Sequence, residues 1–264
     1  MRYFLTLSYL GTHYHGWQSQ PNAPSVQQTI ENALARILAL NACPVTGCGR
    51  TDTGVHASRY VAHFDTEKEL PASFLKGINS ILPPDIAVQQ VVAMGEDDLT
   101  ALPHARYSAV LRQYTYHIVG RKDPFSLQTA WYYPLLHRLD YNKLVAAAAL
   151  IRSFDTFFPF CKTESGTSHY RCELHSLYWQ HLPDQQRLLL HISANRFLRG
   201  MVRLITGACI QVAAGQMSLA DIEKALVNQT TLPKTLSVPP QGLFLTDVQY
   251  PETLIRPQPS WQIP

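Results

Sequence analysis

The sequence predicts an α+β fold made of two halves that repeat one order of elements, β-α-β-β-α-β. Segments of alternating apolar residues, which are typical of strands, are separated by segments with helical spacing. The same order of segments occurs before and after Pro103. The chain has 264 residues, 46% of them hydrophobic and 16% charged, so it is long enough and apolar enough for two ordinary domains.

The first half begins with Arg2–Tyr9, whose alternating apolar positions predict a strand. Ser25 and Gln28 have the spacing of a capping box, and the apolar stripe that runs from Val26 to Leu38 predicts a helix. The other elements are predicted as strands over residues 43–47, 59–66 and 86–92 and a helix over residues 74–82, which ends before two prolines.

The second half shows similar start and stop signals. Asp140 and Ser218 are expected to cap two helices, and Gly215 is placed to end another. A proline-containing turn joins two alternating segments as a hairpin. These elements are strands over residues 107–119, 174–181, 187–194 and 243–250, a helix that reaches residue 151, a helix over residues 197–214 and a short helix after residue 218.

This order of elements is that of the ferredoxin-like, split βαβ unit. We therefore predict two tandem ferredoxin-like halves, residues 1–103 and 104–250, which form a mostly antiparallel sheet with helices on one side. Residues 251–264, with four prolines, are predicted to lie as a tail across the surface.

The composition limits the function classes. A net charge of +3 and a pI near 8.6 permit a nucleic-acid partner without requiring one. Five scattered cysteines predict reduced thiols and a cytoplasmic protein. The sequence has no run of eighteen apolar residues and no signal-peptide pattern near residue 1, so we expect no membrane partner.

The segment Gly49–Ala57, GRTDTGVHA, places Arg50 and Asp52 between two glycines on a loop. A turn or capping role is the ordinary explanation for an aspartate in such a loop. An arginine beside it would keep the carboxyl group ionised and oriented. Such an aspartate can serve as a nucleophile or a base, so Asp52 is the candidate catalytic residue. The sequence leaves open whether Arg50 itself faces Asp52.

The predicted strand over residues 107–119 holds a second candidate group. Period-two alternation puts Arg112, Tyr114 and Tyr116 on one face. Two tyrosines beside an arginine can form a stacking platform for a nucleobase. Taken alone, the pattern is better explained by a half-buried strand face, because tyrosine is a good strand former.

Three arginines form the third group. Arg199 and Arg203 on the predicted helix over residues 197–214, and Arg196 directly before it, gather opposite an apolar stripe. No acidic residue occurs from Asn195 to Gln211. A solvated helix face usually mixes charge signs, whereas a face of one sign can lie along phosphates. Arg199 and Arg203 are one turn apart and can approach the same anionic site.

Two further groups have competing explanations. Cys161, His169, Cys172 and His175 are zinc-type ligands, but their spacing matches no zinc pattern, so we expect no metal and a buried Cys172. The polar and aromatic loop over residues 13–17 can contact a ligand, or its Trp17 can fill a gap between the halves.

Four segments together resemble the successive motifs of the TruA-type tRNA pseudouridine synthases. The similarity extends over most of residues 3–250 and departs locally at CKTESGTSHYRCEL, where that family varies. The matching segments are YLGTHYHGWQSQP with SVQQTIENAL, GRTDTGVHA, HARYSAVLRQYTYHI and NRFLRGMVRLITGA.

The resemblance implies an enzyme that isomerises uridine to pseudouridine at positions 38, 39 and 40 of the tRNA anticodon stem-loop. It implies a homodimer that uses no cofactor and no metal. The family's catalytic aspartate matches Asp52, and the tyrosine that stacks on the target base and takes part in its deprotonation matches Tyr114. The arginine that pairs with the catalytic carboxylate matches Arg203, and an arginine that flips and holds the nucleotide matches Arg50.

The residue patterns fit this chemistry. The isomerisation is redox-neutral, so no cofactor motif is needed, and the uridine must leave its stack before it can react. Arg112 and Arg199 are additional predicted substrate contacts. Because the candidate residues come from both halves, we predict a central active-site cleft. The alternatives are a non-catalytic RNA-binding protein with ferredoxin-like sheets and a zinc hydrolase or deaminase that uses the Cys/His group.

Overall fold

The computed structural model describes residues 1–94, 103–162 and 169–251. These residues contain nine strands and five α-helices, which confirms the predicted mixed α+β class. They divide into two compact units, Met1–Leu111 with the segment from Leu245 onward, and Arg112–Phe244. The predicted halves, residues 1–103 and 104–250, are a different division of the chain and stay a prediction.

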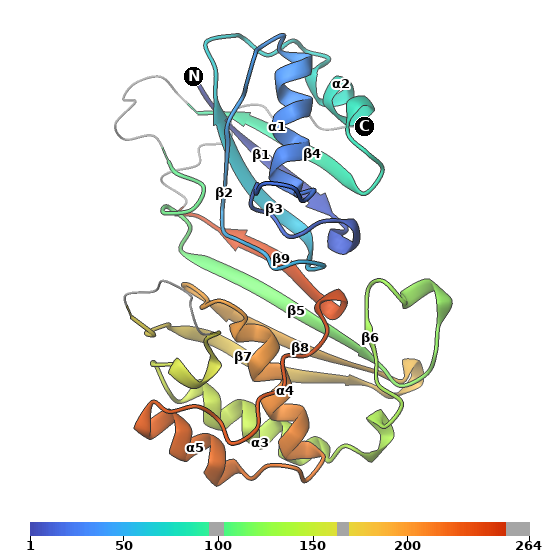
Figure 1. Cartoon of the computed structure of the whole chain (residues 1–264), viewed down its shortest axis with the longest axis vertical. Coiled ribbons are helices and arrows are strands. Elements are labelled where there is room, and N and C mark those ends of the chain that lie inside the picture. Colours follow the sequence, from blue (N-terminus) through green and yellow to red (C-terminus); the bar gives the residue numbers. More distant parts are fainter. Residues whose placement is uncertain (95–102, 163–168, 252–264) are drawn as a thin grey trace. The chain divides into compact units, whose positions relative to one another are not determined.

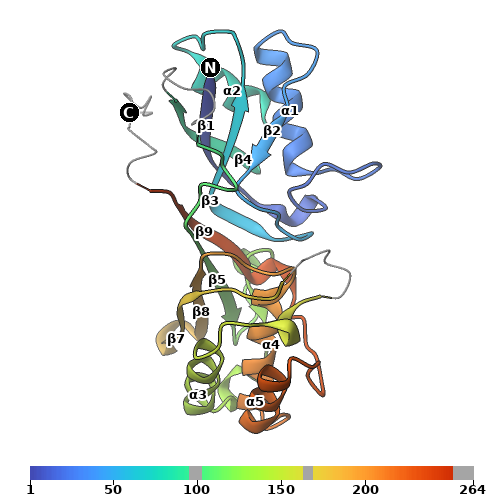
Figure 2. The same cartoon turned by 90° about the vertical axis from the view of Figure 1, so that its left-hand side faces the viewer.

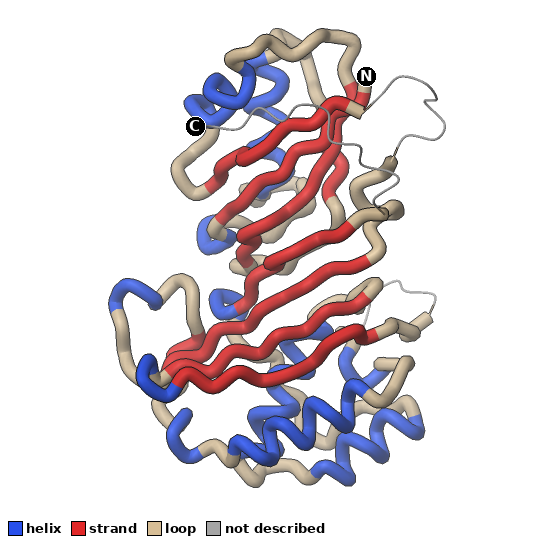
Figure 3. Tube along the Cα trace, turned by 180° about the vertical axis from the view of Figure 1, so that it is seen from behind, coloured by secondary structure: helices blue, strands red, loops and turns tan. Residues whose placement is uncertain are grey.

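The first unit is an antiparallel sheet with two helices on one face (Figure 1). The strands follow the order β4-β1-β3, so β4 lies at an edge, and the short strand β2 also pairs with β3, off this path. Seen from behind, the opposite face of this sheet has no helix among the described residues (Figure 3). The elements are β1 (Arg2–Tyr9), α1 (Val26–Ile37), β2 (Val45–Gly47), β3 (His56–Asp65), α2 (Phe74–Ile81) and β4 (Ile86–Ala93).

Helix α1 begins where the sequence predicts. The Ser25 side chain accepts a hydrogen bond from the Gln28 main-chain N–H at 3.2 Å, as an N-cap does. The reciprocal half of the predicted capping box is wrong, because the Gln28 side chain bonds Ser19 and Asn32 instead. The apolar stripe of α1 packs toward the sheet, where Ile30 and Leu34 are completely buried.

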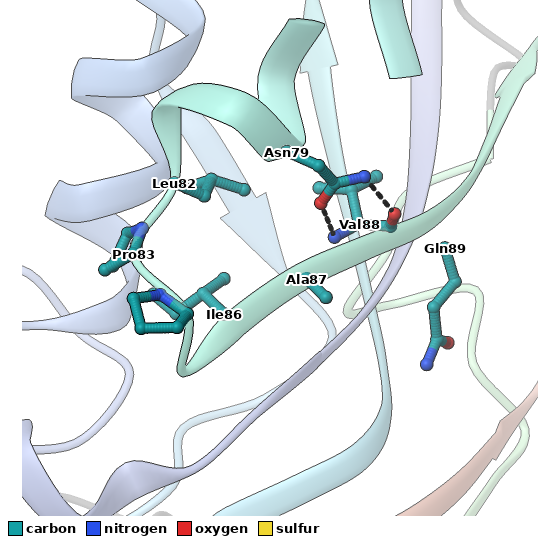
Figure 4. Close-up of a pocket in the computed structure, with 8 residues that line it drawn as sticks. Asn79, Leu82, Pro83, Ile86, Ala87, Val88 and Gln89 are labelled. Atoms are coloured by element: carbon teal, nitrogen blue, oxygen red, sulfur yellow. Dashed lines mark hydrogen bonds between the residues drawn. The ribbon is translucent and has the colours of Figure 1, made fainter. Parts of the chain in front are cut away.

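The edge strand β4 is covered in part by a side chain. The Asn79 amide donates to the Val88 carbonyl and accepts from the Val88 N–H, both at 2.8 Å (Figure 4). Asn79 therefore occupies the main-chain N–H and carbonyl of Val88, which at an open sheet edge could pair with another strand. A cavity of about 570 Å³ lies beside them, and its other lining residues are Leu82, Pro83, Pro84, Ile86, Ala87 and Gln89. None of these residues is titratable, so this larger cavity is not a candidate catalytic site.

The second unit is also a sheet with helices packed on one face (Figure 2). Its strands follow the order β5-β8-β7 and are antiparallel, with β6 parallel to the end of β5. Strand β9 crosses the unit boundary between Phe244 and Leu245. The elements are β5 (Leu111–Val119), β6 (Trp131–Tyr132), α3 (Tyr141–Arg152), β7 (Leu174–Leu182), β8 (Arg187–Ala194), α4 (Met201–Ala213), α5 (Leu219–Asn228) and β9 (Leu243–Gln249).

Three capping predictions for the second half are confirmed. The Asp140 carboxylate accepts from the N–H groups of the first turn of α3, and Ser218 forms a capping box with Asp221 at the start of α5. Gly215, with φ +70°, follows the C-cap of α4. Most of the predicted tail, residues 252–264, lies outside the described residues.

Two predicted boundaries are wrong. The strand expected from residue 107 begins at Leu111, because residues 105–108 form a turn. The helix expected from Phe197 begins at Met201, after Gly200, whose φ of +72° is left-handed. Arg196 and Arg199 therefore precede α4 and do not share a helix face with Arg203.

Candidate active site

The segment Gly49–Ala57 forms a loop that leads from β2 into β3 in the first unit. Its main chain is tied to the preceding loop over residues 11–17. Trp17 N–H donates to the Thr51 carbonyl at 3.3 Å, and Gly54 N–H donates to the Tyr14 carbonyl at 3.3 Å. Asp52, half-buried, lies between these two anchors, and its carbonyl accepts from Val55 N–H at 3.1 Å. The backbone on both sides of Asp52 is thus held by hydrogen bonds.

Three buried aromatic residues, Tyr9, Trp17 and Tyr60, pack against this loop. The rings of Trp17 and Tyr60 stack with centroids 4.0 Å apart. The Tyr9 hydroxyl is 2.9 Å from Thr51 Oγ1, and the Tyr60 hydroxyl donates to the Gly49 carbonyl. The two hydroxyls therefore hold the loop on either side of Arg50. Trp17 is 2% exposed and packs inside the first unit. A gap between the halves and a ligand contact by the loop over residues 13–17 both stay predictions.

Close backbone contacts fix the second part of the loop. Gly11 N–H donates to Nδ1 of the completely buried His56 at 2.9 Å. A Cβ added to Gly11 would lie 2.0 Å from the Val55 carbonyl oxygen, so only glycine fits there. Of the two glycines that bracket Arg50 and Asp52, only Gly54 has a positive φ, at +75°. The sharp turn is therefore at Gly54.

Arg50 is exposed and points to a small polar cavity. Its Nε donates to Gln18 Oε1 at 3.2 Å. The cavity has a volume of about 160 Å³, and its lining includes Arg50, Gln18, Gln27 and Arg106. Gln18 and Arg106 did not stand out in the sequence, because a glutamine and an arginine far apart in the chain show no local pattern.

Tyr114 and Arg112 lie on β5 in the second unit, and both are half-buried. The Tyr114 ring meets the Phe197 ring edge-on at 5.1 Å. Arg112 donates to the Asn195 carbonyl at 2.9 Å. Tyr116, which we expected beside Tyr114 as part of a platform, is completely buried and donates to the Pro239 carbonyl at 2.7 Å. The platform of two tyrosines is therefore wrong, and only Tyr114 of the pair can meet a base.

The three arginines of the third group are separated by the late start of α4. Arg203 is in the first turn of α4, and its Nε donates to the Val238 carbonyl at 2.7 Å, which orients the guanidinium. Arg199, exposed, lies in the turn before the helix, and Arg196 contacts His169 Nε2 at 2.7 Å. The signal that could have corrected the prediction is Gly200 itself, because glycine is a poor helix-interior residue.

The Cys/His group shows no metal geometry. Among the residues that the structure describes, no three His, Cys, Asp or Glu side chains converge on a point that could hold a metal ion. Cys172 is buried, as expected, and burial raises the pKa of its thiol to about 11. All five cysteines are free thiols. The zinc hydrolase alternative therefore has no supporting observation in the described structure.

Helices in the described ranges are all too short or too polar to cross a membrane.

Comparison with known proteins decides between the remaining alternatives. A family model described as tRNA pseudouridine synthase matches residues 6–107 and 154–251, which is more than half of the chain. The chain belongs to the tRNA pseudouridine synthase family. The first matched segment contains the whole Gly49–Ala57 loop, and the second contains Arg199 and Arg203.

Full-length relatives of this family are similar to the chain. A tRNA pseudouridine synthase A from Porphyromonas gingivalis is 36% identical over 96% of this chain and 98% of the relative. One from Bacteroides fragilis is 39% identical over 96% of this chain and 98% of the relative. One from Listeria monocytogenes is 35% identical over 94% of this chain and 99% of the relative. This tRNA pseudouridine synthase is therefore an isomerase, and the alternative of a non-catalytic RNA-binding protein is not supported.

Proposed function

We propose that this synthase isomerises uridine to pseudouridine at positions 38, 39 and 40 in the anticodon stem-loop of tRNA. The observation that carries the proposal is the Gly49–Ala57 loop, which presents Asp52 on a backbone held from both sides and lies within the family match. A carboxylate with a fixed position is what a reaction at the ribose of one nucleotide needs.

In the proposed reaction, the C1′–N1 bond of the uridine breaks and a C1′–C5 bond forms. The proton at C5 leaves, and N1 gains a proton, so atoms and charge balance and no electrons are exchanged. We therefore propose that the enzyme needs no cofactor and no metal. Asp52 acts at the ribose, either by addition to C1′ or by removal of the C2′ proton.

We propose that Tyr114 stacks on the extruded uracil and takes part in the removal of the C5 proton. Its half-buried ring, held edge-on by Phe197, supports this role, because a braced aromatic ring loses little freedom when a base stacks on it. Stacking would offset part of the cost of unstacking the uridine, which is a few kcal/mol.

We propose that Arg203 pairs with the Asp52 carboxylate and that Arg50 holds the flipped nucleotide. The Nε contact from Arg203 to Val238 supports this by orienting the guanidinium, and the exposed side chain of Arg50 supports the second role. Arg112 and Arg199 are proposed to contact substrate phosphates. These residues come from both predicted halves, so the central cleft remains part of the proposal.

The remaining proposals concern architecture and assembly. We propose that residues 1–103 and 104–250 are tandem ferredoxin-like halves. The antiparallel pairing of β1 with β3 and β4, and of β2 with β3, in the first unit supports this. Residues 251–264 are proposed as a surface tail. We also propose a cytoplasmic homodimer. The five free cysteines support the location, and the family resemblance implies two subunits.

The proposal is tested with tRNA transcripts that carry 5-³H-uridine at only one of positions 38, 39 and 40. The proposal predicts tritium release from each of the three transcripts. A control transcript has cytidine at all three positions and labelled uridine elsewhere, and it should release none. Release from the control at the same rate, or none from the three test transcripts, would contradict the assignment.

A further inference from the structure

The turn His104–Ser108 of the first unit exposes a large aromatic residue. Tyr107 is 77% exposed, whereas large aromatic side chains are usually mostly buried. It packs only partly, against the His104 ring with centroids 4.4 Å apart. The Arg106 guanidinium carbon is 5.7 Å from the Tyr107 ring centroid. An exposed ring and a cation therefore share one turn.

This turn is held firmly within itself. His104 Nδ1 accepts from the N–H groups of Arg106 and Tyr107 at 3.1 and 3.2 Å. The Ser108 hydroxyl accepts from His104 N–H at 2.9 Å, and Ser108 N–H donates to the His104 carbonyl at 2.9 Å. Because four hydrogen bonds close the turn, the exposed Tyr107 ring is presented on a fixed backbone.

The turn is also anchored to the sheet. The buried His63 accepts from Ala105 N–H at 3.1 Å, and the Tyr250 hydroxyl donates to the Ala105 carbonyl at 2.6 Å. Arg2 donates to the Pro103 carbonyl at 3.2 Å. A segment that packed only for stability would turn its aromatic ring toward these anchors. Here the anchors hold the backbone while the ring faces outward, which is the arrangement of a binding surface.

The cavity beside the turn indicates the charge of the ligand. Arg106 lines the same polar cavity as Arg50, with the amides of Gln18 and Gln27. Among the described residues that line it there is no carboxylate. The Gln27 amide already donates to the Glu31 carboxylate and to the Val45 carbonyl, at 2.9 and 3.0 Å. The two guanidinium groups beside this small cavity therefore carry the inference, and they favour a phosphate.

We propose that Arg106 and Tyr107 form a second tRNA contact, in which the Tyr107 ring stacks on an unpaired base and Arg106, with Arg50, binds a neighbouring phosphate. This proposal rests on the proposed function, since tRNA is the ligand. Arg50 is two residues from Asp52 in the sequence, and Arg106 lines the same cavity as Arg50. The proposed base is therefore a nucleotide that neighbours the reacting uridine in the tRNA sequence. The contact positions the RNA and has no part in the chemical step.

The test is the affinity for unmodified tRNA transcript, measured by fluorescence anisotropy in full-length protein that carries Asp52→Asn. Binding of tRNA does not depend on turnover. Failure of this proposal would show as unchanged affinity, whereas failure of the proposed function would show as absent tritium release by the wild-type enzyme. Tyr107→Ala should weaken binding by about 5- to 150-fold, the range for loss of one stacked base. Tyr107→Phe keeps the ring and should bind as the parent does.

Tyr178→Ala is the matched control, because Tyr178 is 51% exposed and stacks on a histidine, His191, with centroids 4.8 Å apart. It should leave the affinity unchanged. In Arg106→Gln, the magnitude of the slope of log affinity against log salt concentration should fall by about 0.7 to 0.9, the value for one lost phosphate contact. The proposal is overturned if Tyr107→Ala binds like the parent, if Tyr178→Ala weakens binding equally, or if Tyr107→Ala changes the oligomeric state without changing the affinity.

Discussion

Gly11 offers a direct way to displace the Asp52 loop without touching the loop's own residues. A Cβ at residue 11 would lie 2.0 Å from the Val55 carbonyl oxygen, whereas ordinary contacts begin at 3.4 Å. In Gly11→Ala the two backbones must therefore separate by about 1.4 Å, the difference between these distances. Val55 N–H bonds the Asp52 carbonyl, so the displacement is passed to Asp52.

A misplacement of about 1 Å can lower a rate by about 100-fold, since catalytic groups must lie within about 0.5 Å of their working position. We therefore expect kcat for tritium release to fall by about 100-fold in Gly11→Ala. The free energy of unfolding, measured by urea denaturation, should fall by about 1–3 kcal/mol, as for other overpacked sites.

Gly215→Ala is the control for a change that only destabilises. Gly215 has φ +70°, and an added Cβ would meet nothing within 4 Å, so only the left-handed backbone opposes alanine. The variant should lose about 1–2 kcal/mol of unfolding free energy and keep its kcat. Wild-type kcat in Gly11→Ala, or an equal loss of kcat in Gly215→Ala, would refute the reasoning.

Three further predictions use other parts of the molecule. Burial, with Arg2 and His104 nearby, lowers the pKa of His63 to about 4, against a weaker opposing effect of Asp65. The unfolded chain therefore binds more protons than the folded chain between pH 4 and 6.5. About 3 kcal/mol of unfolding free energy should be present above pH 6.5 and be lost as the pH falls toward 4. The unfolding free energy of His63→Asn, measured in urea, should lack this pH dependence. Tyr114→Phe should retain tRNA affinity while Tyr114→Leu weakens it by about 1–3 kcal/mol in the same anisotropy assay, and equal affinity of all three proteins would remove the stacking argument. Asp140→Ala should cost about 1 kcal/mol of unfolding free energy through the lost N-cap of α3, with unchanged kcat as the check that the effect is structural.

Local signals predicted most of the fold. Strand β1 and the start of α1 follow from alternation and from Ser25, because a strand's period and an N-cap are written in consecutive residues. The start of β5 did not follow, because the turn at residues 105–108 is closed by the side chain of His104, which alternation does not register. The start of α4 was placed too early because its apolar spacing continues backward through Gly200.

The candidate site was predicted less completely than the fold. Asp52 and Arg50 stand out because their motif is contiguous. The supports of the loop do not, since Tyr9, Tyr60 and His56 are joined to it by contacts between segments that are distant in the chain. Tyr116 was misassigned because period-two alternation places a residue on a face without saying how deeply that face is buried.

The most direct test of the central claim is the turnover of Asp52→Asn, measured as tritium release from tRNA that contains 5-³H-uridine. Asparagine keeps the size of the side chain but removes the carboxylate, so folding and tRNA affinity should stay those of the wild type. The account predicts that release falls to the background of a no-enzyme control. Substantial release by a folded Asp52→Asn protein would contradict it, because the reaction would then proceed without the carboxylate that the loop is built to hold.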